Sequence, residues 1–441
     1  MISLRRGFAG GGLLSRALPD ELQRGAEPVG RPPRDEDEWW MQRALERAMS
    51  GNGRSHPNPT VGCVIVKDGR VLAEGATEVH GGRHAERVAI QSVADRSVLR
   101  GATIYVTLEP CSHTGRQPPC ADLVESCGFA RCVIGLADPN PLVAGGGLRR
   151  LRRAGVELRL GVLRDELIAW HLPFLFWQLA RRPLMAAKWA QTLDGQLAYD
   201  DGRSQWISGE ESRAYAHWLR QKYDAILVGA GTVLADHPSL TVRSCRGPHH
   251  RQPVRLLFDP HARILSCPEE QWRALCQRTF SPEAPTVLMM GGPALPEAGR
   301  ERLSAPGLEH VHVLPLPDGE PPILGLYEAL ADPLLAERVG RPLHSVMVEG
   351  GPRLLSALAA ADLLDLAHVF TAPTIGGGHR HRLGLATAHG TGFRLRPFAH
   401  ARLGDDLLTE YLRPSTSALL EGLESIGWGD EVFHSLAVGP A

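Results

Sequence analysis

Three potential metal ligands lie between residues 84 and 120, and this group constrains the fold more than any other feature of the chain. His84-Ala85-Glu86 comes first, and the run E-P-C-S-H-T-G-R-Q-P-P-C follows, with Cys111 and Cys120 as its two thiols. A histidine and two cysteines leave one position of a tetrahedral zinc open, and a nearby carboxylate can carry protons. We therefore predict a catalytic zinc site formed by His84, Cys111 and Cys120, with Glu86 as the proton shuttle.

The segments around these ligands alternate between helix and strand patterns. Apolar residues at helical spacing follow Asp35 or Asp37, and further helices are expected to open at His84 and at Cys120. The predicted strands are 61–66, 71–75, 102–108, 131–136 and 156–160. This alternation predicts an α/β domain with a parallel or mixed sheet. The ligands would then lie at strand-to-helix junctions, where a helix N-terminus stabilises a thiolate.

A closed structural zinc site is the alternative at this place. It needs a fourth protein ligand, and His113 between the two cysteines could supply it. That arrangement would leave Glu86 without a task. The pattern H-x-E followed by P-C and a second cysteine is instead typical of zinc deaminases, although eight residues separate the cysteines here instead of two.

Composition limits the other possibilities. With 441 residues the chain exceeds the usual size of one hydrophobic core, so two domains are expected. Its 48 basic and 49 acidic residues give no bulk attraction to nucleic acid or to a membrane surface. The 8 irregularly spaced cysteines favour reduced thiols or metal ligands over a disulfide framework. No apolar run is long enough to span a bilayer, and 171–180, broken by Pro173, is expected to be a buried connector. We expect a cytoplasmic protein.

The motifs as a set resemble one family. In one chain stand H-P-N-P-T-V-G-C-V-I-V-K-D-G, H-A-E, Y-V-T-L-E-P-C-S-H-T-G-R-Q-P-P-C and A-D-P-N-P-L-V-A-G-G-G. The chain resembles the bifunctional deaminase-reductases of riboflavin biosynthesis, in which the widened cysteine spacing and G-R-x-P-P also occur. The resemblance implies a cytidine-deaminase-like αβα zinc domain at 37–180 and a dihydrofolate-reductase-like α/β domain at 181–414. Residues 1–36 are expected to be a disordered extension, and 415–441 a tail without an assigned role.

The resemblance also implies two reactions. The first is hydrolytic, zinc-dependent deamination of 2,5-diamino-6-(5-phosphoribosylamino)pyrimidin-4(3H)-one. The second is NADPH-dependent reduction of the ribosyl arm to give 5-amino-6-(5-phosphoribitylamino)uracil. It matches His84, Cys111 and Cys120 to the zinc ligands and Glu86 to the proton shuttle. Asn58, constrained between two prolines, is either a clamp on the substrate ring or a turn residue.

The second half has its own pattern. Strands are predicted at 184–191, 225–228 and 345–349, a helix at 210–222, a flexible turn at 229–232 and a helix from Pro352 to Leu364. A strand, the Gly350-Gly351 pair and a helix N-terminus can form an anion site. No full G-x-G-x-x-G fingerprint is present, which disfavours a Rossmann fold.

The resemblance supplies candidate residues for this half. It implies NADPH contacts by Ala190, Trp206, Thr232, Asp236, Gly351, Pro352, Arg353, Leu354, Leu355, Ser356 and Ala357. It implies substrate contacts by Ser204, Arg220, Leu240, Arg243 and Glu349, in addition to Asn58. Arg220 and Arg243 could clamp a 5-phosphate, or either could form a surface ion pair. Lys188 and Asp194 are candidates for proton handling or for orienting the cofactor, and burial of Lys188 would lower its pKa as an acid role requires.

Three residues depart from the family pattern. His171 stands where asparagine is common, Thr192 where serine is common, and His237 where a second aspartate usually follows Asp236. Long surface loops are expected at 246–253 and 291–322.

Two other functions remain open. A base deaminase with an unrelated second domain is disfavoured by near-neutral charge and 6% aromatic residues. A zinc-stabilised regulatory module that senses a nucleotide is the other. The expected partner is a small phosphoribosylated pyrimidine, with no nucleic acid or membrane partner and a possible homo-oligomer.

Overall fold

The computed structural model describes residues 35–115, 117–201, 206–243, 251–292, 297–317, 322–378 and 393–424. Residues 1–34 of the predicted extension 1–36, residues 425–441 of the predicted tail 415–441, residues 246–250 of the predicted loop 246–253, and Ser204 lie outside these residues. The described chain divides into two compact units: one holds the residues up to Arg181 and from Ser417 onward, the other Arg182–Thr416. None of the described helices is long and apolar enough to cross a membrane.

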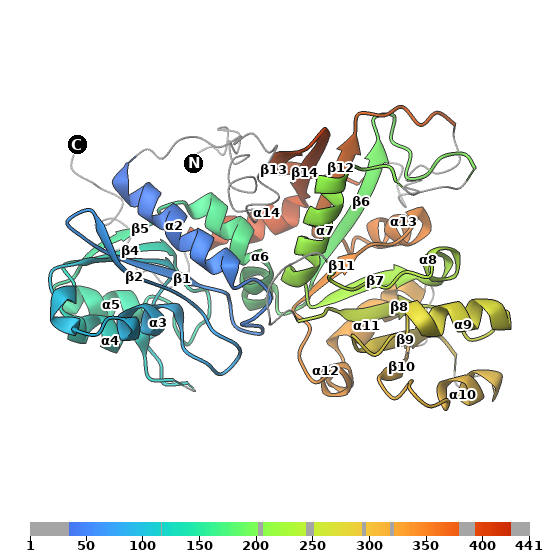
Figure 1. The fold of residues 1–441 in the computed structure, drawn as a ribbon, viewed down its shortest axis with the longest axis horizontal. Helices are drawn as coiled ribbons and strands as arrows, with labels where there is room; N and C mark the ends of the chain where they lie inside the picture. Colours follow the sequence, from blue (N-terminus) through green and yellow to red (C-terminus); the bar gives the residue numbers. More distant parts are fainter. Residues whose placement is uncertain are drawn as a thin grey trace. The chain divides into compact units, whose positions relative to one another are not determined.

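The N-terminal unit is built on a five-stranded sheet with strand order β2-β1-β3-β4-β5 (Figure 1). Its strands are β1 (Gly62–Lys67), β2 (Arg70–Ala76), β3 (Thr103–Leu108), β4 (Arg131–Leu136) and β5 (Glu157–Leu160). β1 runs antiparallel to β2 and β3, whereas β3, β4 and β5 are parallel. The helices are α2 (Glu36–Ser50), η1 (Arg96–Leu99), α3 (Ala85–Ser92), α4 (Cys120–Cys127), α5 (Gly146–Arg153) and α6 (Arg164–Ala180). The α/β class predicted for this half is confirmed.

Two glycines allow helices to approach the two faces of this sheet. A Cβ atom on Gly62 would lie 1.8 Å from the carbonyl oxygen of Ala44 in α2. A Cβ atom on Gly75 would lie 2.3 Å from the carbonyl oxygen of Ala85 in α3. Only glycine permits such close backbone contact. In Figure 1, α2 and α6 lie on one side of the sheet and α3, α4 and α5 on the other, which makes three layers.

The helix α6 corrects one expectation. The segment 171–180 was predicted to be a connector broken by Pro173, but Pro173 lies inside a continuous helix of 17 residues. Burial holds the helix together: Leu172, Leu175 and Phe176 are at most 2% exposed. Packing of this face outweighs the hydrogen bond that a proline removes.

The C-terminal unit contains a nine-stranded sheet with strand order β10-β9-β8-β7-β11-β6-β12-β14-β13. Its strands are β6 (Leu184–Thr192), β7 (Ala225–Gly229), β8 (Val254–Phe258), β9 (Thr286–Met290), β10 (Val311–Pro315), β11 (Ser345–Val348), β12 (Leu366–Ala372), β13 (Arg396–Leu403) and β14 (Asp406–Leu412). Neighbouring strands from β10 to β12 are parallel, and β14 and β13 add an antiparallel edge. The α/β prediction is confirmed here too.

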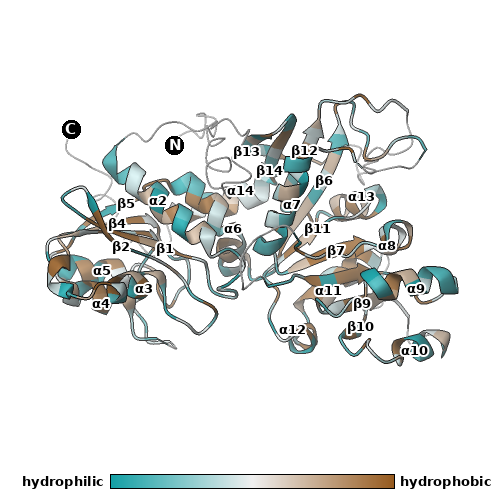
Figure 2. Ribbon diagram, viewed as in Figure 1, coloured by the Kyte–Doolittle hydropathy of each residue, from teal (hydrophilic) through white to brown (hydrophobic). Residues whose placement is uncertain are grey.

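The helices of this unit are α7 (Glu210–Lys222), α8 (Ala230–Asp236), α9 (Glu269–Arg278), α10 (Glu297–Leu303), α11 (Pro322–Ala331), α12 (Pro333–Val339) and α13 (Pro352–Ala360). Figure 2 shows apolar strands in the sheet and helices with a polar side. The core between them includes Met185, Leu227, Leu256 and Val346. α14 (Pro414–Glu421) and η2 (Gly422–Glu424) end the described chain.

Three predictions for this half need correction. The predicted flexible turn at 229–232 is wrong, because α8 begins at Ala230 and buries Val233. The helix predicted to reach Leu364 ends at Ala360. The predicted loop 291–322 contains α10 and β10, whose short apolar patterns are hidden among prolines and glycines. The strands at 184–191 and 225–228 and the helix at 210–222 are confirmed.

Candidate functional site

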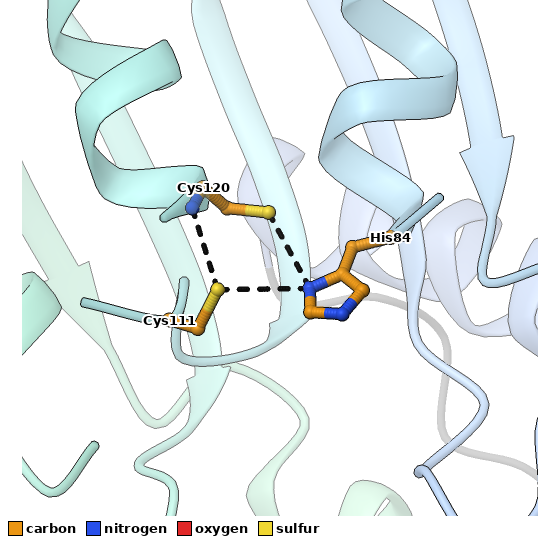
Figure 3. A group of neighbouring side chains, drawn as sticks. All are labelled: His84, Cys111 and Cys120. Atoms are coloured by element: carbon orange, nitrogen blue, oxygen red, sulfur yellow. Dashed lines mark hydrogen bonds between the residues drawn. The ribbon is translucent and has the colours of Figure 1, made fainter. Parts of the chain in front are cut away.

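His84, Cys111 and Cys120 converge as predicted, and all three lie in or next to strand-to-helix connections. His84 is the N-cap of α3, Cys120 is the first residue of α4, and Cys111 follows β3. The ligand atoms of the three lie within 4.8 Å of one another. His84 Nδ1 is 3.6 Å from Cys111 Sγ and 3.5 Å from Cys120 Sγ, and Figure 3 shows the ring nitrogen directed at both sulfurs.

This geometry fits a tetrahedral metal. Zinc bonds of about 2.3 Å to sulfur and about 2.0 Å to nitrogen place tetrahedral S and N ligands about 3.5 Å apart. The donor set also suits zinc, because two thiolates and one imidazole are its ordinary ligands in proteins. The three residues present therefore fit the predicted ion.

The two thiols are not equivalent. The backbone N–H of Cys120 donates a hydrogen bond to Cys111 Sγ across 3.3 Å. Hydrogen bonding from the Cys120 side chain outweighs burial and lowers the pKa of Cys111 to about 4. The same hydrogen bond, together with burial, raises the pKa of Cys120 far above its ordinary value.

Glu86 lies in the first turn of α3 and is only 3% exposed. Burial is the main cause that raises the pKa of Glu86 to about 7, and the negative charge of Cys111 adds to the effect. A carboxyl group with such a pKa can take and release a proton near neutral pH, which is the property that a proton shuttle needs.

The structure speaks against a closed site with His113. Among the described residues, the group of converging histidine, cysteine and carboxylate ligand atoms contains His84, Cys111 and Cys120 and no fourth member. Three protein ligands leave a coordination position for water or substrate.

Sequence reasoning missed the role of Glu109, which precedes Pro110 and Cys111. Its buried carboxylate accepts four backbone N–H groups, from Asp138, Gly145, Gly147 and Leu148. These bonds tie the connection before α5 to the connection that carries Cys111. The signal was present in the sequence as E-P-C and A-D-P-N-P, but only the fold shows that the two motifs touch.

Asn58 lies in the turn after the cis peptide bond between His56 and Pro57. Its backbone N–H donates to Ser55 O at 2.9 Å, and its carbonyl accepts from Ser55 Oγ at 3.0 Å. The main-chain groups of Asn58 thus stabilise the turn. Within the described part of the chain, its side-chain amide forms no hydrogen bond. Both predicted roles of Asn58 are compatible with this arrangement.

In the C-terminal unit, two predicted cofactor segments meet. Thr232 in α8 and Gly351 before α13 follow the adjacent parallel strands β7 and β11. The Gly351 N–H donates to Thr232 Oγ1 at 3.2 Å. Gly351 is the N-cap of α13, so the free N–H groups of that helix begin at this contact.

The other predicted cofactor residues differ in accessibility. Leu354 and Leu355 are buried in the core cluster, so their side chains serve packing. Trp206 is 64% exposed and lies against the guanidinium of Arg213, 4.7 Å from the ring centroid. Ala190, Pro352, Ser356 and Ala357 are half-buried, and Arg353 and Asp236 are exposed.

Arg220 and Glu349, both predicted to contact substrate, are paired with each other. Arg220 Nε and Nη2 donate to the two carboxylate oxygens of Glu349 at 2.6 and 2.9 Å. Burial alone would raise the pKa of Glu349, but the charge of Arg220 and its hydrogen bonds hold it at about 2. Arg220 is therefore in a mostly buried ion pair, neither the free phosphate clamp nor the surface pair of the prediction.

Lys188 and Arg243 complete the charged group around this pair. Burial lowers the pKa of Lys188, the direction that an acid role requires, while the charge of Glu349 opposes the change. Arg243 is exposed, and no carboxylate pairs with it in the described segments. Partial burial and the charges of Arg220 and Arg278 lower the pKa of Arg243. An anion beside Arg243 would relieve that repulsion.

Asp194 holds a loop. Its carboxylate accepts the Thr192 hydroxyl at 2.5 Å and the N–H groups of Gly376 and Gly377 at 2.9 Å each. The hydrogen bond from the Thr192 hydroxyl is the main cause that lowers the pKa of Asp194 to about 2. Proton handling and orienting the cofactor both stay predictions for Asp194, and its low pKa favours the second.

The three departures lie at ordinary structural positions. Thr192 supplies the hydroxyl that a serine would supply. His171 is buried, with Nε2 3.3 Å from Thr107 Oγ1. His237 ends α8 in the left-handed conformation.

Comparison with known proteins matches each half of the chain to a known domain family. Residues 34–136 match the cytidine and deoxycytidylate deaminase zinc-binding region, and residues 183–409 match the RibD C-terminal domain. The riboflavin biosynthesis protein RibD of Aquifex aeolicus is 37% identical over 345 residues, which cover 78% of this chain and 89% of that protein. RibD of Escherichia coli is 37% identical over 371 residues, 80% and 92% of the two chains.

A solved structure also matches most of this chain. The Thermotoga maritima diaminohydroxyphosphoribosylaminopyrimidine deaminase/5-amino-6-(5-phosphoribosylamino)uracil reductase is 34% identical, with a TM-score of 0.69, over 86% of this chain and 98% of that one. An Acinetobacter baumannii RibD structure is 30% identical, with a TM-score of 0.67. Because the RibD proteins of Aquifex aeolicus and Escherichia coli are each 37% identical and are matched over 89% and 92% of their length, this chain belongs to the RibD family of riboflavin biosynthesis proteins.

Proposed function

We propose that the chain catalyses two successive steps of riboflavin biosynthesis. The N-terminal unit deaminates 2,5-diamino-6-(5-phosphoribosylamino)pyrimidin-4(3H)-one, and the C-terminal unit reduces the ribosyl arm of the product with NADPH. The observation that carries this proposal is the convergence of His84, Cys111 and Cys120 beside buried Glu86.

In the deaminase, His84 Nδ1 and the sulfurs of Cys111 and Cys120 would hold zinc. A bound zinc ion supplies a water of lowered pKa at the open coordination position. Glu86 takes a proton from the attacking water and delivers it to the ring nitrogen beside the amidine carbon. It then takes the remaining proton from the hydroxyl group of the adduct and passes it to the amine, which leaves as ammonia as the carbonyl group forms. Asn58 is proposed as a polar clamp on the ring.

In the reductase, the chain binds the substrate and supplies a proton. Exposed Arg243 is suited to the 5-phosphate, because a guanidinium can bind two of its oxygens. The Arg220–Glu349 pair fixes a carboxylate next to Lys188, whose lowered pKa suits it to donate the proton that accompanies hydride transfer. NADPH is proposed to lie along Ala190, Trp206, Thr232, Asp236 and the segment from Gly351 to Ala357.

We assign 37–180 to the deaminase and 181–414 to the reductase, which the matched ranges 34–136 and 183–409 support. The substrate is a small molecule, so we also propose a cytoplasmic location, where NADPH is supplied. We assign no nucleic-acid partner.

Replacement of Glu86 tests the deaminase. We expect Glu86→Gln to keep one zinc per chain, because the ligands are untouched, and to lose at least 100-fold in ammonia release, because the proton path is removed. Zinc content and ammonia release from the diamino substrate are measured together. Glu125→Gln, which changes a half-exposed carboxylate on α4, is the matched control. Wild-type-like deamination by Glu86→Gln would overturn the proposal.

A further inference from the structure

The segment from Pro238 to Arg243 follows α8 and has no regular secondary structure. It carries Leu240 and Arg243, two predicted substrate contacts. Leu240 has φ of 52°, in the left-handed region that residues other than glycine rarely adopt. Something outside the segment must therefore hold its conformation.

Side chains of other elements hold the main chain of this segment. The carbonyl of Pro238 accepts from Thr279 Oγ1 at 3.0 Å, and that of Ser239 from Arg255 Nε at 2.9 Å. The carbonyl of Thr241 accepts from Arg220 Nη1 at 2.8 Å. A loop whose carbonyls bind long side chains instead of a neighbouring strand takes its shape from those side chains.

The side-chain amide of Gln252 forms hydrogen bonds with both main-chain groups of Val242, the residue before Arg243. Its Oε1 accepts from Val242 N at 2.7 Å, and its Nε2 donates to Val242 O at 3.1 Å. The amide thus imitates a strand partner for one residue. Arg341 Nη2 in turn donates to the carbonyl of Gln252 at 2.7 Å, which fixes the main chain from which this side chain extends.

Arg255 is a fully buried cation in β8. Besides Ser239 O, it donates to Ser281 O, Ser281 Oγ, Ala284 O and Thr286 Oγ1, at distances from 2.7 to 3.3 Å. None of these partners in the described segments is a carboxylate. Burying a guanidinium without a counter-ion is unfavourable, and an apolar side chain of similar size would fill the space without this desolvation free energy. The arrangement makes sense if the guanidinium is needed to fasten the segment at Ser239.

We propose that Gln252 and Arg255 are positioning residues of the reductase: they hold the segment 238–243 so that Leu240 and Arg243 are preorganised for a phosphate-bearing substrate. This inference rests on the proposed function for the identity of the substrate. Neither residue touches the substrate, and both act through the main chain of Ser239 and Val242. Preorganisation lowers the cost of ordering the loop on binding, so its loss appears in substrate binding before it appears in hydride transfer.

The test compares Gln252→Ala and Arg255→Met with the full wild-type chain. Starting from the deaminated phosphoribosyl intermediate, we expect KM for that substrate to rise at least tenfold, kcat to fall less than threefold and KM for NADPH to stay within twofold. By calorimetry, affinity for inorganic phosphate should fall in parallel. Amide hydrogen exchange at Val242 should accelerate while β8 and β9 keep their protection. If Arg255→Met does not fold, Gln252→Ala, whose side chain is only partly buried, carries the test alone.

Arg302→Met is the matched control, because Arg302 Nη1 donates to the carbonyl of Leu265 at 2.9 Å and so fastens a different loop of the same unit. It should leave KM for the substrate within twofold. Faster exchange at Val242 with unchanged KM and unchanged phosphate affinity would overturn the inference, as would unchanged exchange. If the wild-type chain does not reduce the intermediate, the proposed function fails, and the inference is then judged on phosphate affinity: a tenfold loss supports it and equal affinity overturns it.

Discussion

Gly147 lies against the backbone carbonyl of Pro110, one residue before Cys111: a Cβ atom on Gly147 would be 2.0 Å from that oxygen. The oxygen belongs to the backbone and cannot rotate away, so Gly147→Ala must displace the Cys111 connection. We expect unfolding to become about 1–3 kcal/mol easier, with zinc affinity and deamination at least tenfold lower and reduction unchanged. Zinc titration and the two separate assays check this.

Gly422→Ala is the control, since a Cβ atom there meets no atom within 4 Å. Full zinc affinity in Gly147→Ala would show that the contact with Pro110 does not position Cys111.

Replacement of Arg220 by methionine is expected to lower folding stability, whereas replacement of Arg243 by methionine is expected to weaken substrate binding. Arg220→Met leaves the buried carboxylate of Glu349 without its partner, which should cost about 3–5 kcal/mol of folding stability. Arg243→Met removes an exposed cation and should change the melting temperature by less than 2 °C, while KM for the phosphorylated intermediate rises at least tenfold. Thermal unfolding and reductase kinetics separate the two. Equal losses of stability would contradict the different environments of the two side chains.

Asp37 should govern part of the acid stability of the N-terminal unit. Burial opposes its ionisation, but hydrogen bonds from Arg131, Tyr105 and Arg159 hold the pKa of Asp37 below its ordinary value of 3.8. Because the folded pKa is the lower one, the stabilisation is present above pH 3.8 and is lost as pH falls through the folded pKa.

We therefore expect Asp37→Asn to be less stable by about 1–3 kcal/mol at pH 7, and to lose less further stability than the wild type between pH 5 and pH 2.5. Melting temperatures over this range are the measurement. Asp68→Asn, in the exposed turn between β1 and β2, should follow the wild-type curve. Parallel curves for Asp37→Asn and the wild type would contradict the assignment.

Removal of zinc should separate the two reactions. A chelator is expected to abolish conversion that starts from the diamino substrate and to leave reduction of the deaminated intermediate within twofold, because the ligands His84, Cys111 and Cys120 all belong to the N-terminal unit. Ammonia release and NADPH oxidation are followed in parallel, and added zinc should restore the first. If reduction of the intermediate required zinc, the proposal that the two reactions occur at independent sites would be wrong.

The convergence of the zinc ligands could be predicted from sequence because its determinants are local. His84 and Cys120 each begin a helix directly after a connection, and the pattern of strand and helix places such positions at one edge of the sheet. The role of Glu109 could not be predicted in the same way. Its partners lie about 30 to 40 residues further along the chain, and only packing of α5 brings their N–H groups to one carboxylate.

The errors have physical causes as well. Pro173 was expected to break a segment that burial keeps helical. The helix α8 was mistaken for a turn because Gly229 and Gly231 flank its first residue and only Ala230 and Val233 are buried. The pairing of Arg220 with Glu349 joins residues 129 positions apart, so a free clamp and an ion pair looked alike in the sequence.

The position of β6 in its sheet has a consequence for synthesis of the chain on the ribosome. β6 is the first strand of its unit, yet both of its hydrogen-bonded neighbours, β11 and β12, come much later, beginning at Ser345 and Leu366. Its apolar sequence, Leu-Met-Ala-Ala, therefore emerges with both edges unpaired. An unpaired apolar strand invites intermolecular association. Slow translation between β6 and β11 would accordingly lower the yield of folded protein more than an equal delay after β14.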